Sequence, residues 1–201
     1  EAISHKIEQL YNYSYNPETE ITVTAGGTQA IFTIITTFVH PGDEVIIFAP
    51  AYDCYAPAIA LNGGKVVEIV LSSPDYHVPW EAVKSQISGK TSMIIINSPH
   101  NPTGALLSEK DMKELEGIIK NTGILVLSDE VYEHIIFDKN SHQSVARFPE
   151  LAKNSFIVAS FGKTFHNTGW KMGYCAAPEV LMAEFRKVHQ FNVFNVNHPI
   201  Q

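Results

Sequence analysis

Short blocks of apolar, often β-branched residues alternate with longer segments of helical periodicity along most of the chain. This alternation is typical of βαβ units, in which successive strands lie parallel in one sheet and helices cover its faces. The expected strands are Val45–Phe48, Lys65–Ile69, Ser92–Asn97, Ile124–Ser128, Phe156–Ser160 and Gly173–Ala176. The expected helices are Glu1–Tyr11, Gln29–Val39, Tyr55–Leu61, Ser108–Lys120 and Pro178–Phe191. We therefore predict a three-layer α/β/α fold with a mostly parallel sheet.

The length and composition of the chain fit one globular domain. Its 201 residues are 45% hydrophobic and 17% charged, and neither an internal repeat nor an interior linker divides them. The formal net charge is -7, with no basic run to offset it. This charge argues against nucleic acid or an acidic membrane as the main partner and favours small-molecule ligands.

No segment approaches the ~18 uninterrupted apolar residues of a membrane span, and the first residues lack the apolar core of a signal peptide. We therefore expect a cytoplasmic location and no membrane partner. The two cysteines, Cys54 and Cys175, lie far apart and match no metal-ligand spacing, so we expect free buried thiols and no metal site.

Polar and aromatic residues follow several of the predicted strands. In parallel α/β sheets, ligands bind outside the carboxyl ends of the strands, so these positions are candidate site residues. They are Tyr52, Asn101, Asp129, Tyr132, Ser160 and Lys163.

Two lysines lie close together in the segment 160–171. Lys163 follows an apolar strand, where we expect desolvation to disfavour its ammonium form and leave a free amine that can attack a carbonyl. Lys171 and Ser160 are suited to holding a phosphate group. An aldehyde and a phosphate in one ligand describe pyridoxal phosphate.

Two further features are consistent with that ligand. Gly26 and Gly27 precede a predicted helix and form a candidate phosphate cup, although paired glycines there also fit an ordinary tight turn. Asp129 is either the N-cap of a following helix or the partner of a buried cation. Beside a pyridine ring it would keep the ring nitrogen protonated, which makes the cofactor an electron sink. If a helix begins at Asp129, Tyr132 faces the same ligand.

Five segments in this order resemble the fold-type I pyridoxal-phosphate aminotransferases of class I/II, and among them the kynurenine and methionine aminotransferase-like group. They are Ala25–Ala30, Pro50–Tyr55, Pro99–Gly104, Ser128–Glu133, and Ser160–Thr164 with Thr168–Lys171. The resemblance covers nearly the whole chain. It implies that residues 1–201 are the cofactor-binding large domain of such an enzyme, truncated at both ends, with the N-terminal segment and the C-terminal small domain missing.

The resemblance also implies roles for the catalytic residues. Lys163 would form the Schiff base with pyridoxal phosphate and then move the proton between the substrate α-carbon and the cofactor. Asp129 would pair with the pyridine nitrogen. Tyr132 and Asn101 would hydrogen-bond the phenolic oxygen of the ring, and Tyr52 would stack on its face.

The remaining implied contacts concern the phosphate and the substrate. The phosphate would be held by Gly27, Thr28, Gln29, Ser160 and Lys171. Many relatives carry arginine at the position of Lys171, and lysine there favours the kynurenine and methionine group. Asn101 would also help to bind the substrate carboxylate.

The implied activity is transfer of an amino group from an L-amino acid to a 2-oxo acid by a homodimer with sites at its interface. Methionine, aromatic amino acids and kynurenine are the expected donors. Two alternatives stay open: a pyridoxal-phosphate-dependent C–S β-lyase, in which the same carbanion expels a β-substituent, and a non-catalytic cofactor-binding sensor domain.

Overall fold

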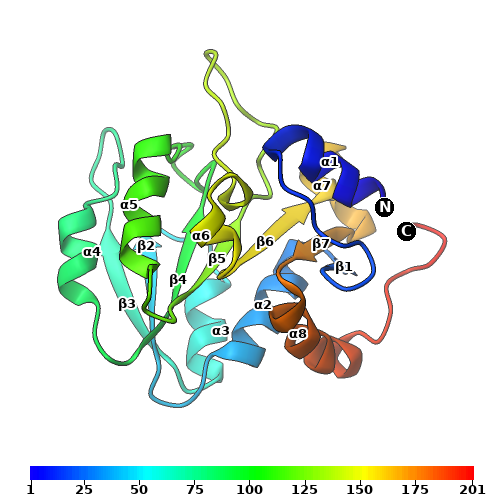
Figure 1. Cartoon of the computed structure of the whole chain (residues 1–201), viewed down its shortest axis with the longest axis horizontal. Helices are drawn as coiled ribbons and strands as arrows, with labels where there is room; N and C mark the ends of the chain where they lie inside the picture. The colour runs from blue at the N-terminus through cyan, green and yellow to red at the C-terminus, as the bar shows by residue number, and fades with distance from the viewer.

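The structure, a computed structural model, describes residues 1–201 and is built around one seven-stranded sheet (Figure 1). The strands are β1 (Ile21–Thr24), β2 (Glu44–Ala49), β3 (Lys65–Val70), β4 (Thr91–Asn97), β5 (Leu125–Asp129), β6 (Ser155–Ser160) and β7 (Gly173–Ala176). Their order is β1-β7-β6-β5-β4-β2-β3. Strands β2 to β6 pair in parallel, whereas β7 is antiparallel to both β6 and β1. The sheet is therefore mostly parallel, as predicted.

Helices cover both faces of this sheet. They are α1 (Ala2–Tyr11), α2 (Gly27–Phe38), α3 (Tyr55–Leu61), α4 (Trp80–Gln86), α5 (Glu109–Ile119), α6 (Pro149–Ala152), α7 (Phe161–Thr164) and α8 (Glu179–Asn192), with short 3-10 helices η1 (Val145–Arg147) and η2 (Thr168–Trp170). Buried residues of α2, α3 and α8 form one core with the sheet, and those of α1, α4, α5 and α6 form a second core on the other face. The predicted three-layer architecture is confirmed.

The two cores follow from the alternation of side chains along a strand. In β4, Met93 and Ile95 belong to the core beneath α2 and α3, whereas Ile94 and Ile96 belong to the core beneath α4 and α5. Both faces of this strand are buried, which explains why it reads as a continuous apolar run.

Helix α5 begins directly after Ser108, the first residue of the predicted helix, which caps it. The Ser108 side chain accepts a hydrogen bond from the Asp111 N–H, and the Asp111 carboxylate accepts one from the Ser108 N–H. This reciprocal capping satisfies two backbone groups that would otherwise lack a partner.

Several local features differ from the prediction. Strand β1 and helix α4 were not expected, because a four-residue strand and a two-turn helix carry too little periodicity to be recognised without their tertiary partners. Helix α2 begins at Gly27 rather than Gln29. No helix begins at Asp129, which ends β5 and is followed by a turn.

None of the helices has the length and apolar character needed to cross a bilayer. Cys54 is partly buried, Cys175 is fully buried, and both are free thiols.

Candidate active site

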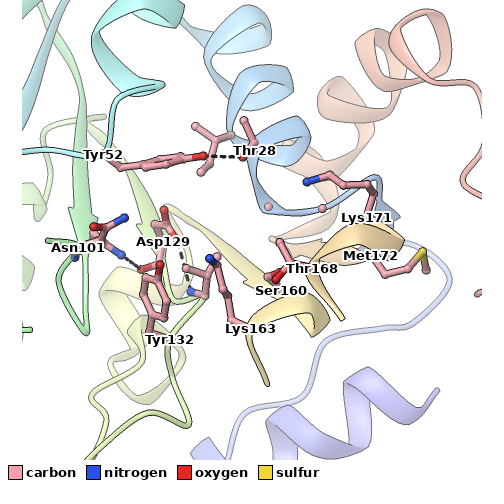
Figure 2. Close-up of a pocket in the computed structure, with 15 residues that line it drawn as sticks. Thr28, Tyr52, Asn101, Asp129, Tyr132, Ser160, Lys163, Thr168, Lys171 and Met172 are labelled. Carbon is pink, nitrogen blue, oxygen red and sulfur yellow. Dashed lines mark hydrogen bonds between the residues drawn. The ribbon is translucent and has the colours of Figure 1, made fainter. Parts of the chain in front are cut away.

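A pocket opens where the carboxyl ends of β5 and β6 meet the start of α2 (Figure 2). Fifteen residues line it. Of the ten predicted site residues, all except Gln29 line it, namely Gly27, Thr28, Tyr52, Asn101, Asp129, Tyr132, Ser160, Lys163 and Lys171. The fold thus brings together residues from five separate sequence segments.

The start of α2 forms one end of the pocket. Gly26 adopts a φ of 84° and a ψ of 171°, a conformation essentially restricted to glycine. The backbone N–H groups of the next three residues, Gly27, Thr28 and Gln29, have no hydrogen-bond acceptor within the chain. Free N–H groups at the start of a 12-residue helix, together with its dipole, attract an anion.

Close packing also favours glycine at position 27. A Cβ atom there would lie 3.0 Å from Val131 Cγ1 and 3.4 Å from Val158 Cγ1. Glycine therefore allows the first turn of α2 to pack directly onto the residues that surround β5 and β6. The glycine turn of the candidate phosphate cup is thus part of the packing between α2 and the sheet.

Cationic and hydroxyl side chains surround the same end of the pocket. The Lys171 side chain reaches across to the glycine turn, since its Nζ would lie 3.4 Å from a Cβ on Gly26 (Figure 2). Ser160 ends β6, and Thr168 in η2 lines the pocket beside it while donating a hydrogen bond to the Gly162 carbonyl. These groups complete an anion-binding environment around the free N–H groups.

Only the backbone of Gln29 is available for the predicted phosphate contact. Its Oε1 accepts a hydrogen bond from the Ala25 N–H at 3.1 Å, and its Nε2 donates to Thr33 Oγ1 at 2.7 Å. Both polar ends of the side chain thus brace the loop and α2, and the side chain does not line the pocket.

Asp129 is buried at the centre of the site, with 3% of its surface exposed. Its Oδ2 accepts a hydrogen bond from the Tyr55 hydroxyl at 2.6 Å, and its Oδ1 accepts a longer one from the Val131 N–H at 3.3 Å. Burial raises the pKa of this carboxyl to about 6, partly offset by the Tyr55 bond. Because a turn follows β5, the N-cap interpretation of Asp129 is wrong.

Lys163 lies on the one-turn helix α7, and its side chain extends into the pocket toward Tyr132 (Figure 2). Its Nζ is 5.4 Å from the centroid of the Tyr132 ring. The predicted desolvation of Lys163 is wrong, since the residue is exposed. The lysine lies three residues beyond the buried strand, on a helix that faces the open side of the pocket. No ion pair joins it to Asp129.

Aromatic and amide groups form the remaining walls. Tyr52 lies across the pocket from Tyr132, and its hydroxyl hydrogen-bonds Thr28 Oγ1 at 3.0 Å (Figure 2). The backbone N–H of Asn101 donates to Asn97 Oδ1 at 2.7 Å, while Asn97 Nδ2 donates to the Asp129 carbonyl at 2.9 Å. Asn97 therefore ties the loop that carries Asn101 to the end of β5.

The sequence reasoning missed several residues of this site, among them Tyr55, Asn97 and Thr168. Asn97 carried a usable signal, because it is the last residue of a buried strand at the ligand-binding edge of the sheet. Tyr55 and Thr168 carried no such signal, apart from their proximity in sequence to Tyr52 and Lys171.

Comparisons with known proteins agree with this geometry. The sequence family of class I and II aminotransferases matches residues 1–201. The chain is 48% identical to the methionine aminotransferase of Escherichia coli (strain K12), an alignment that covers all of this chain and 52% of that protein. It is 33% identical to the human kynurenine–oxoglutarate transaminase 3, with coverage of 100% and 46%.

Solved structures show the same relationship. The crystal structure of an Escherichia coli protein with a methionine aminotransferase function matches with a TM-score of 0.97 at 48% identity, covering 99% of this chain and 53% of that one. The N-succinyldiaminopimelate aminotransferase of Mycobacterium tuberculosis matches with a TM-score of 0.94 at 35% identity, covering 98% and 51%. The chain thus spans about half the length of these relatives, and the predicted fold of an aminotransferase large domain is confirmed. Because the family sequence matches every residue of this chain and the fold is the same, the chain belongs to the class I and II aminotransferases.

Proposed function

We propose that the pocket binds pyridoxal 5′-phosphate and serves transamination between an L-amino acid and a 2-oxo acid. One observation carries the proposal: a lysine side chain, a buried carboxylate and a helix start with free N–H groups line the same pocket. Each of these groups matches a different part of the cofactor, namely its aldehyde, its ring nitrogen and its phosphate.

The residues present fit the phosphate well. Three backbone N–H groups without acceptors, the turn at Gly26 and the cationic Lys171 lie together, with the Ser160 hydroxyl nearby. A phosphate group accepts hydrogen bonds from all of these donors and balances the lysine charge. Gln29 would contribute only its backbone N–H.

When bound, pyridoxal phosphate supplies an electron sink for the electron pair released at the substrate α-carbon. Asp129 would support this role by holding the ring nitrogen in its protonated form, because an ionised carboxylate buried beside it favours the positive charge. Tyr132 and Asn101 would donate hydrogen bonds to the phenolic oxygen of the ring. Tyr52 would cover one face of the ring.

Lys163 has two roles in this proposal. Its amine would attach the cofactor covalently and, once released by the substrate amine, would take the proton from the substrate α-carbon and donate it to the C4′ carbon of the cofactor. General bases act at hydrogen-bond distance, so Lys163 has to lie beside the reacting carbon. Its position on α7, extending into the pocket, is suited to this.

The proposed donor is methionine or an aromatic or kynurenine-like amino acid. The similarity to the Escherichia coli methionine aminotransferase supports the first, and the similarity to human kynurenine–oxoglutarate transaminase 3 supports the last. Asn101 would contact the substrate carboxylate. We further propose that residues 1–201 act as the cofactor-binding large domain within a homodimer, in keeping with the family.

The visible absorption spectrum of the chain mixed with pyridoxal phosphate tests this function. We expect a protein-bound absorption band that converts to the spectrum of the pyridoxamine form when L-methionine is added. Lys163→Ala is the control and should give no covalently bound cofactor. A wild-type chain that develops no bound band would contradict the proposal, and release of ammonia and a 2-oxo acid without pyridoxamine phosphate would indicate elimination instead.

A further inference from the structure

The shortest hydrogen bond to the Asp129 side chain comes from Tyr55. The Tyr55 hydroxyl lies 2.6 Å from Oδ2, whereas the Val131 N–H lies 3.3 Å from Oδ1. The Asn97 side chain donates its hydrogen bond to the Asp129 main-chain carbonyl and not to the carboxylate. Tyr55 is therefore the one side chain that fixes the plane of this carboxylate.

Tyr55 is itself held rigidly. It is the first residue of α3, is 3% exposed and packs in the core formed with α2 and α8. Its ring meets the Tyr52 ring edge-on, with centroids 5.7 Å apart. Because both the backbone and the ring are fixed, the hydroxyl presents its proton from one direction.

The direction of this hydrogen bond is also determined. Burial and the neighbouring Asp129 raise the pKa of Tyr55 well above its ordinary value, so the phenol keeps its proton and acts as the donor. An ionised carboxylate offers only acceptors, whereas the protonated acid also needs an acceptor for its own proton. The contact with Tyr55 therefore favours the ionised carboxylate.

The other influences on Asp129 either oppose its ionised form or favour that form less strongly than Tyr55 does. Burial opposes its ionisation and Glu130 adds to this, whereas Lys163 favours ionisation but by less than the Tyr55 bond does. The Cys54 thiol is protonated, with its pKa raised to about 12 by burial and by Asp129 itself. Tyr55 thus makes the largest single contribution in favour of the charged form.

We propose that Tyr55 is a positioning residue for the transamination: its hydroxyl orients the Asp129 carboxylate and favours the ionised form that a protonated ring nitrogen requires. The inference rests on the proposed function, but the coupling of Tyr55 to Asp129 is a property of the chain itself. It can therefore be measured without the cofactor.

The first test is the titration of Asp129 in the cofactor-free chain, followed by carboxyl ¹³C NMR with labelled aspartate. The signal is assigned by its absence in Asp129→Asn. In Tyr55→Phe we expect the titration midpoint to rise by about one pH unit or more, because a hydrogen bond to the charged form is lost. Tyr52→Phe removes a neighbouring hydroxyl that bonds Thr28, and should leave the midpoint unchanged.

An unchanged or lowered midpoint in Tyr55→Phe would overturn the inference. If that variant does not fold, the wild-type chain provides the test through the Tyr55 hydroxyl proton in ¹H NMR. That resonance should move downfield as Asp129 ionises. A Tyr55 resonance that does not shift over the Asp129 titration would also overturn the inference.

The second test is a double-mutant cycle on the dissociation constant of pyridoxal phosphate. We expect Tyr55→Phe to weaken binding about 10-fold in the wild-type background and much less in the Asp129→Asn background. Equal losses in both backgrounds would mean that Tyr55 does not act through Asp129. If the wild-type chain binds no pyridoxal phosphate, the proposed function fails, while the titration still decides the role of Tyr55.

Discussion

Replacing Asp129 with asparagine should stabilise the cofactor-free fold at neutral pH, although it removes a group that we place at the centre of the chemistry. Burial raises the pKa of this carboxyl from 3.8 to about 6. At 1.36 kcal/mol for each pH unit, holding the carboxylate ionised in the folded chain costs about 3 kcal/mol. Asparagine has nearly the same shape and carries no charge, so it avoids that cost.

The sign of the pH dependence follows from the raised pKa. The folded chain binds the Asp129 proton more tightly than the unfolded chain, so this residue disfavours folding progressively as pH rises from 3.8 to about 6, with no further change above. The asparagine variant has no such titration. Its stability relative to wild type should therefore increase by roughly 2 kcal/mol between about pH 4.5 and about pH 8.

Urea denaturation of both proteins at the two pH values, followed by circular dichroism, measures this difference. Comparing the two pH values cancels any pH-independent effect of the amide on local packing. The exposed Asp75 provides a matched control, since Asp75→Asn should give no gain in relative stability with pH. A stability difference between Asp129→Asn and wild type that does not change with pH would refute the reasoning.

Three further predictions concern the cofactor contacts. The Lys163→Ala variant should still bind pyridoxal phosphate through the phosphate group. After borohydride reduction and denaturation, mass spectrometry should find no cofactor attached to this variant. Cofactor that is still attached would exclude Lys163 as the anchor. Gly26→Ala should lower the free energy of unfolding by roughly 1–3 kcal/mol because of its positive φ, whereas Gly89→Ala, at an open position without such a φ, should not. Lys171→Gln should weaken pyridoxal phosphate binding more than pyridoxal binding, measured by fluorescence titration, and an equal loss for both ligands would place Lys171 away from the phosphate.

Much of the architecture could be predicted because it depends on local patterns. Strands such as β4 and β6 are continuous apolar runs, and the Ser108 cap marks the start of α5. The residues that line the pocket could also be located, because the edge at which parallel strands end is fixed by the fold class. Short elements such as β1 could not, since its four residues form a strand only by pairing with β7, about 150 residues later in the chain.

Long-range contacts determine what the sequence could not show about the site. The hydrogen bond that controls Asp129 joins it to a residue 74 positions earlier, and neither residue type specifies the other. Gly173 presents the same problem: a Cβ there would lie 2.6 Å from the Ala159 carbonyl oxygen and 3.0 Å from Gly27 N. Its side of β7 must therefore lack a side chain for the glycine turn to approach β6.

Three features of the pocket oppose the stability of the folded chain. The Asp129 carboxylate is buried without a cationic partner, the N–H groups at the start of α2 have no acceptor, and Gly26 adopts a backbone conformation that other residues avoid. They lie in one pocket, and a single ligand with an anionic group at one end and a protonated nitrogen at the other would supply every missing partner. Functional sites are where local rules and global fold conflict, because the compensating interaction comes from the ligand. The position of these conflicts is thus independent support for the proposed cofactor, in addition to the family relationship.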